Sequence, residues 1–126
     1  MYPFLKSGDR LKIAPAREGE IKAGDLVAVN RKDKNGAWFV VHRVVKISKD
    51  NDEKLTYFTK GDAQKGGLDS SVNIEGLAGK VSRIHRNGLE VNLEKPGWKL
   101  ANTLVAKLSL KYPRLLIFLS SYINLI

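Results

Sequence analysis

Six short runs rich in valine, isoleucine, leucine and aromatic residues recur along the chain before Pro96, and they constrain its fold more than any other feature. Turn-forming residues separate the runs, as is typical of strands joined by short loops. The runs cover residues 10–14, 25–30, 37–47, 55–59, 77–85 and 89–93. A length of 126 residues with 43% hydrophobic content suits one core. The sequence therefore predicts a mainly β protein, with a largely antiparallel β domain over residues 1–94.

A two-residue turn is indicated at Asn87-Gly88, between the runs VSRIHR and LEVNLE. Both central positions of a type I′ turn need a positive φ, which asparagine and glycine tolerate. This pair predicts a β-hairpin formed by the last two runs.

After Pro96-Gly97 the apolar residues change to helical spacing, and Lys99, Lys107 and Lys111 lie off the apolar stripe. The stripe comprises Trp98, Ala101, Leu104, Val105, Leu108 and Tyr112. We therefore expect residues 95–126 to form a short, basic and apolar helical appendage of the same domain.

Pro113 is expected to end or kink this helix, because proline lacks the amide hydrogen that the helix needs. The segment after Arg114 holds only about a dozen residues, whereas a spanning helix needs roughly 20. It can pack on the domain, lie at an interface or begin a longer segment.

The chain contains no cysteine, which excludes disulfides, thiolate metal sites and cysteine nucleophiles. Its two histidines, His42 and His85, have neither a second histidine nor a carboxylate cluster at metal-ligand spacing. We therefore expect no metal and no organic cofactor.

The chain carries 22 basic and 13 acidic residues, a net charge of +9, which raises nucleic acid or an anionic membrane surface as partners. Residues 1–60 lack the arginine and aromatic interleaving of a base-stacking surface. Residues 95–126 contain no acidic residue, and their basic residues are Lys95, Lys99, Lys107, Lys111 and Arg114. This pattern favours a membrane surface over nucleic acid.

Four motifs, MYPFLKSGDRLKI, GDLVAV, VVHRVVKI and FTKGDA, follow one another in this order. Together they resemble the signal peptidase I family, membrane-associated serine endopeptidases that cleave signal peptides from exported proteins. The resemblance covers about residues 1–85. It implies a coiled, antiparallel signal-peptidase-like β fold, precursor proteins as substrates and a catalytic domain on the extracytoplasmic side of the membrane.

In this family the first motif reads Ser-Met-x-Pro, and the serine is the nucleophile. Met1, Tyr2 and Pro3 match the positions after that serine and are expected at the substrate-binding groove. The serine would then lie one position before Met1, so we expect the printed chain to be inactive. A shortened form, which would also lack the membrane anchor, and an inactive relative both remain open. Ser7 is a poor substitute nucleophile because it lies in the turn KSGD.

His42, in HRV, matches the general base of the histidine-type members found in archaea, the endoplasmic reticulum and some sporulating bacteria. A neutral imidazole, with an unperturbed pKa of about 6.5, can accept a serine proton at neutral pH. Asp62, in TKGD, matches the aspartate expected to orient His42, and Asp69 is the second acidic candidate. His85 is expected to have a structural role, and so are the turn aspartates Asp9 and Asp25.

A noncatalytic peptide-binding module of the same fold is the alternative function. A self-cleaving repressor-type relative is disfavoured, because such proteins use a lysine base and carry a DNA-binding domain. The sequence indicates neither which precursors are cleaved nor the oligomeric state.

Overall fold

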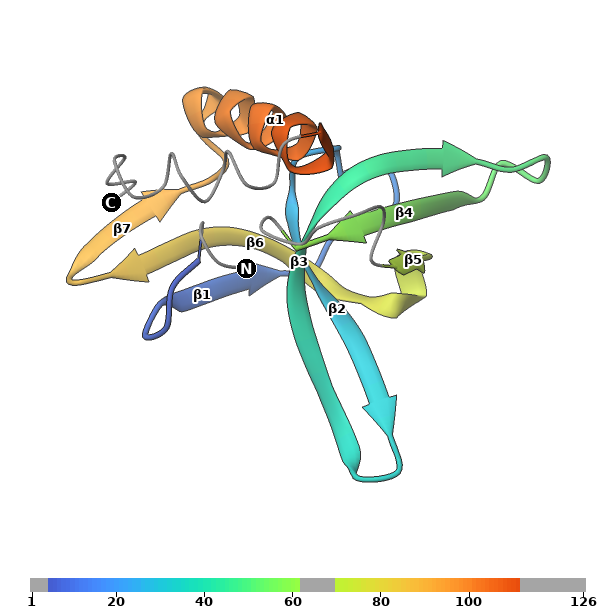
Figure 1. Ribbon diagram of the computed structural model, residues 1–126, viewed down its shortest axis with the longest axis horizontal. Coiled ribbons are helices and arrows are strands. Elements are labelled where there is room, and N and C mark those ends of the chain that lie inside the picture. Colours follow the sequence, from blue (N-terminus) through green and yellow to red (C-terminus); the bar gives the residue numbers. More distant parts are fainter. Residues whose placement is uncertain (1–4, 62–69, 112–126) are drawn as a thin grey trace.

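The computed structural model describes residues 5–61 and 70–111, which form seven strands, a short 3₁₀ turn and one helix (Figure 1). The elements are β1 (Arg10–Ala14), β2 (Leu26–Asp33), β3 (Gly36–Lys49), β4 (Leu55–Lys60), β5 (Ser70–Val72), η1 (Ile74–Gly76), β6 (Leu77–Arg86), β7 (Leu89–Asn92) and α1 (Pro96–Lys111). Each of the six predicted runs overlaps one strand, and β2 and β3 extend two or three residues beyond their runs. The sequence missed β5, because a strand of three residues with two serines carries no apolar run.

All seven strands belong to one antiparallel sheet with the order β1-β6-β2-β3-β4-β5. β7 lies off this path and pairs with β6, so that β6 contacts three partners. The predicted mainly β class is therefore confirmed. The hairpin at Asn87-Gly88 is confirmed too, since these residues have φ values of 52° and 76° and Arg86 pairs with Leu89.

Two apolar clusters lie on opposite faces of the sheet, because successive side chains of a strand point to opposite faces. On β2, Leu26 belongs to one cluster and Val27 to the other. We call the first the helix-side core; its buried members are Leu5, Leu26, Val81, Ile84 and Leu93. We call the second the opposite-side core; its buried members are Ile21, Val27, Val29, Val44 and Tyr57.

Helix α1 packs on the helix-side core through Trp98 and Val105. Leu104, a member of the predicted apolar stripe, does not pack on this core, since 53% of this residue is exposed. Asn102 and Ala106 occupy the buried face instead, each only 3% exposed. A polar contact between Asn102 and β3 sets the rotation of the helix, and apolar periodicity alone could not reveal it.

That contact involves Arg43 of β3, whose guanidinium is fully buried. Its Nη1 donates hydrogen bonds of 2.8 Å to the Asn102 side-chain oxygen and 2.8 Å to the Gly24 carbonyl. Gly24 has a φ of +103°, and a Cβ there would lie 2.8 Å from the backbone nitrogen of Thr103. Glycine therefore permits both the turn and the close approach of α1, and α1 is fastened directly to β3.

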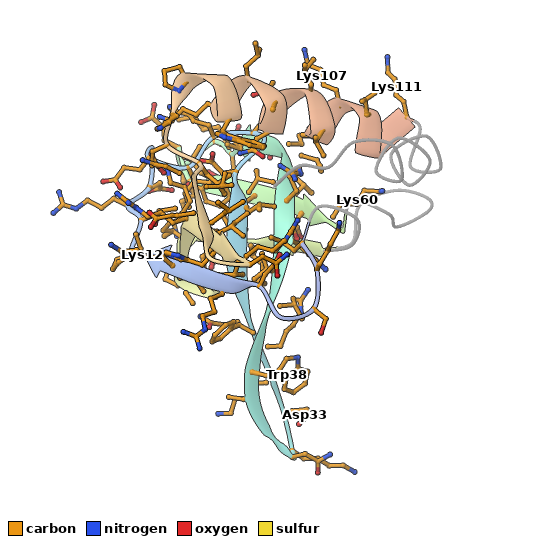
Figure 2. All side chains as sticks on the ribbon, turned by 90° about the vertical axis from the view of Figure 1, so that its left-hand side faces the viewer. Lys12, Asp33, Trp38, Lys60, Lys107 and Lys111 are labelled. Atoms are coloured by element: carbon orange, nitrogen blue, oxygen red, sulfur yellow. The ribbon has the colours of Figure 1, made fainter. Side chains whose placement is uncertain are left out.

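The distal halves of β2 and β3 form a two-stranded hairpin that projects from the body, at the end opposite to α1 in both views (Figures 1 and 2). Trp38 is 47% exposed and Phe39 is 56% exposed on this hairpin. Among the residues that the structure describes, no helix has the length and apolar composition needed to cross a bilayer.

Candidate functional site

His42 lies near the middle of β3, where its side chain is half-buried. It pairs with Val27 of β2, so its imidazole is on the face of the opposite-side core. A strand flanked by β2 fixes the backbone of His42 more firmly than a loop would. The predicted base therefore has a rigid support.

β4 ends beside His42. The last register pair between β3 and β4 joins Arg43, the residue after His42, to Lys60, the last residue of β4. The sequence continues from Gly61 into Asp62. Asp62 and Asp69 lie outside the described residues, as do Met1, Tyr2 and Pro3.

Two cations are buried next to this point, and the sequence reasoning missed both. Arg43 and Lys60 are cross-strand neighbours, and each is 0% exposed. The Lys60 ammonium donates to the Gly61 carbonyl at 3.4 Å. A basic residue inside an apolar strand is the signal that marks both, in HRVV and FTKG. Such a cationic environment stabilises ionised carboxylates nearby.

The described chain begins at Leu5, which packs in the helix-side core against Leu26, with Val41 nearby. Val41 precedes His42 on β3, but the two side chains point to opposite faces. Leu5 therefore lies on the face of the sheet opposite to the imidazole of His42.

An ion pair holds the turn that follows Leu5. Asp9 accepts hydrogen bonds of 2.6 Å at each carboxylate oxygen from Nε and Nη2 of Arg86, and one of 2.9 Å from the Lys6 amide. The side chains are only 9% exposed for Arg86 and 4% for Asp9. The Arg86 hydrogen bonds lower the pKa of Asp9. Ser7 is exposed in this turn, which agrees with its predicted position.

One edge of β3 lacks a strand partner among the described residues over residues 36–41. β4 pairs with β3 only from Arg43 onward, whereas β2 pairs with β3 along residues 36–43. Within the described ranges, no strand therefore pairs with the outer edge of residues 36–41. An extended peptide can add to such an edge by main-chain hydrogen bonds.

No family model, curated protein or solved structure matches the chain. The resemblance to signal peptidase I therefore stays a prediction. Within residues 5–61 and 70–111, no three histidine, aspartate or glutamate side chains lie together as a metal site would require.

His85 lies on β6 beside the Asn87-Gly88 turn, and 46% of its side chain is exposed. Its Nε2 is 3.5 Å from a carboxylate oxygen of Glu90, its partner across the hairpin. Arg83 also contacts Glu90 and lowers the pKa of this carboxyl. His85 therefore takes part in a surface charge cluster and is separated from His42 in the sheet by β2.

Proposed function

We propose that this domain belongs to a serine endopeptidase of the signal peptidase type, with His42 as its general base. The observation that supports the proposal is the register of β3 and β4: β4 ends at Lys60, which pairs with Arg43, the residue after His42, and the sequence continues from Lys60 into Gly61-Asp62. The finer fold expectation, a coiled signal-peptidase-like sheet, belongs to the same proposal, and the single antiparallel sheet is compatible with it.

The nucleophile of this enzyme is a serine one position before Met1. Leu5 lies on the helix side of the sheet, whereas the imidazole of His42 lies on the other face. Four extended residues span up to about 14 Å, which is comparable with the roughly 10 Å between packed layers.

In the proposed mechanism, the serine hydroxyl attacks the peptide carbonyl while His42 accepts its proton and then delivers it to the leaving amine. Asp62 or Asp69 orients the imidazole and stabilises the imidazolium. The serine's own backbone amide contributes to oxyanion stabilisation.

The substrate binds as an extended strand along residues 36–41 of β3, and Met1, Tyr2 and Pro3 are the substrate-binding residues that the family resemblance implies. Signal-peptide-bearing precursors, small side chains near the cut and an extracytoplasmic location follow from the family resemblance. A membrane surface is the expected setting.

The test restores the nucleophile and compares the two histidines. A form with the native upstream segment and a serine immediately before Met1 should cleave signal peptides in detergent or lipid. His42→Ala should slow cleavage by at least about 100-fold, because it removes the general base. His85→Ala is the matched control and should leave the rate unchanged. Equal losses in the two histidine variants would contradict the assignment of His42 as the base. Asp62→Ala and Asp69→Ala would show which carboxylate contributes more to the rate.

The open edge of β3 also favours the second candidate, a noncatalytic peptide-binding module. Strand addition needs the edge but no nucleophile. If the native upstream sequence has no serine and the printed chain still binds extended peptides, the binding module is the better account.

A further inference from the structure

The outward face of α1 combines exposed leucines with lysines. Leu100, Leu104, Lys107 and Lys111 follow one another at spacings of four, three and four, so they form one stripe along the helix. Leu100 is 65% exposed and Leu104 is 53% exposed. Asn102, on the opposite face, is buried against β3. The two leucines therefore have no role in the core.

The charge of α1 has one sign, since the helix contains Lys99, Lys107 and Lys111 and no acidic residue. Lys99 lies 3.7 Å from Glu94, while the ion pairs recorded for the described residues include neither Lys107 nor Lys111. Both of these side chains point away from the sheet (Figure 2). The lysines of the stripe are complementary to an anionic surface. The leucines favour a surface with an apolar interior, such as a lipid bilayer.

The sequence continues this character beyond the helix. Residues 112–126 are largely apolar, and Arg114 is their only charged residue. An exposed leucine pair, lysines that form no ion pair with another described residue, and an apolar continuation of the sequence thus occur at the same end of the described chain.

The β2–β3 hairpin is the competing surface, and it fits a bilayer less well. Trp38 and Phe39 are adjacent on β3, so they project from opposite faces of the ribbon. Lys32, Asp33 and Lys34 occupy its tip and would have to enter first. The hairpin also lies at the end of the molecule opposite to α1 (Figures 1 and 2), so one flat surface cannot engage both.

We propose that α1 docks on an anionic lipid bilayer and lies parallel to its surface. Leu100 and Leu104 enter the boundary between headgroups and acyl chains, and Lys107 and Lys111 extend their ammonium groups to the phosphates. The sheet then lies on the aqueous side, with the β2–β3 hairpin directed away from the bilayer. This inference does not rest on the proposed hydrolysis.

Vesicle flotation of the full chain tests the charges. The probe is phosphatidylcholine vesicles with and without an equal part of phosphatidylglycerol. Lys107→Gln/Lys111→Gln should weaken binding to the anionic vesicles roughly 30-fold. Each lysine near such a surface strengthens binding about fivefold, and the two factors multiply. Lys32→Gln/Lys34→Gln removes the same charge from the hairpin and should have little effect. Equal losses in the two double variants would mean binding by net charge alone and would overturn the proposal.

A second pair of variants tests the apolar part. Leu100→Asn/Leu104→Asn changes only exposed residues, so circular dichroism and melting should stay unchanged while binding falls about tenfold or more. Trp38→Asn/Phe39→Asn is the control and should bind normally. Unchanged binding of the leucine variant would overturn the proposal, since residues 112–126 would then suffice.

Fluorescence quenching by lipids with brominated acyl chains reports the orientation. In a Trp98→Phe background, Trp38 is the only tryptophan and should escape quenching. Efficient quenching of Trp38 would place the hairpin in the bilayer and contradict docking through α1.

Discussion

At the scale of single residues, the Asp9–Arg86 pair shows how a turn residue acquires a second role. Asp9 caps its own turn by accepting the Lys6 amide, as the sequence led us to expect for an aspartate after glycine. The pair with Arg86 joins positions far apart in the chain, and only the folded sheet brings them together.

The pH dependence of stability should reveal this pair. The pKa of Asp9 is lowered in the native state, so the native state binds fewer protons than the unfolded chain, whose aspartate has a pKa of about 3.9. The stabilisation is therefore complete above that value and is lost as pH falls through the native pKa. Asp9→Asn should lower the free energy of unfolding by about 2 kcal/mol at pH 7, between the values for exposed and buried pairs.

Urea titrations of the original chain and Asp9→Asn at neutral and acidic pH provide the measurement. The difference between the two proteins should shrink below about pH 4. A difference that stays constant down to strongly acid pH would show that charge does not cause it.

The limits of the sequence at this scale are visible in HRV and TKGD. Both motifs were recognised from residue order, and His42 was expected on a strand. The full burial of Arg43 and Lys60 was not expected, because cations are rarely buried unless the fold supplies partners. The sequence shows that a charged residue stands at an unusual position within an apolar strand. It does not show which groups accept hydrogen bonds from that residue, because the acceptors of Arg43, Gly24 and Asn102, lie in other parts of the chain.

At the scale of elements, the strands were predicted more accurately than the orientation of the helix. Alternation and turn residues are local signals, and the Asn87-Gly88 turn determines its hairpin almost alone. The buried face of α1 depends on Asn102, which an apolar pattern ignores. The same contact explains why Leu104, a member of the predicted apolar stripe, lies on the exposed face of the helix.

Asn102→Ala should therefore destabilise the protein, because the buried Arg43 guanidinium loses an acceptor. A loss of about 1 to 3 kcal/mol in the free energy of unfolding is expected from chemical denaturation. Leu104→Ala, on the exposed face of the same helix, is the control and should change stability by less than about 0.5 kcal/mol. Equal effects would mean that α1 is not held through Asn102.

Gly24→Ala tests the close approach of α1 to the sheet. The new Cβ would lie 2.8 Å from the Thr103 nitrogen, and φ at this position is +103°. Both effects disfavour alanine, so we expect a loss of at least about 1 to 2 kcal/mol, the cost of the backbone conformation alone. Gly88→Ala, with φ of 76° and open space around it, isolates the backbone contribution. A smaller loss at Gly24 than at Gly88 would contradict the packing argument.

At the scale of the whole molecule, the distal β2–β3 hairpin is separable from both cores. Arg31 and Trp38 are cross-strand partners, so Asn-Gly can replace residues 32–37 and close a two-residue turn. The melting temperature should change by no more than a few degrees, because surface loops tolerate such changes. A large drop would show that the hairpin contributes to the core.

Peptide binding along β3 should weaken in the same hairpin variant if the outer edge of β3 holds the substrate.

β6 has a consequence for the order in which the chain can fold. Its partners β1 and β2 are synthesised long before β6, since Arg10 pairs with His85 and Val27 pairs with Lys80. By contrast, β2, β3 and β4 form a meander of consecutive strands. Contacts between distant segments form slowly. On the ribosome, the meander can assemble first, and β1 must wait for residue 86 to emerge. Hydrogen exchange on stalled nascent chains should show early protection in β3 and late protection in β1.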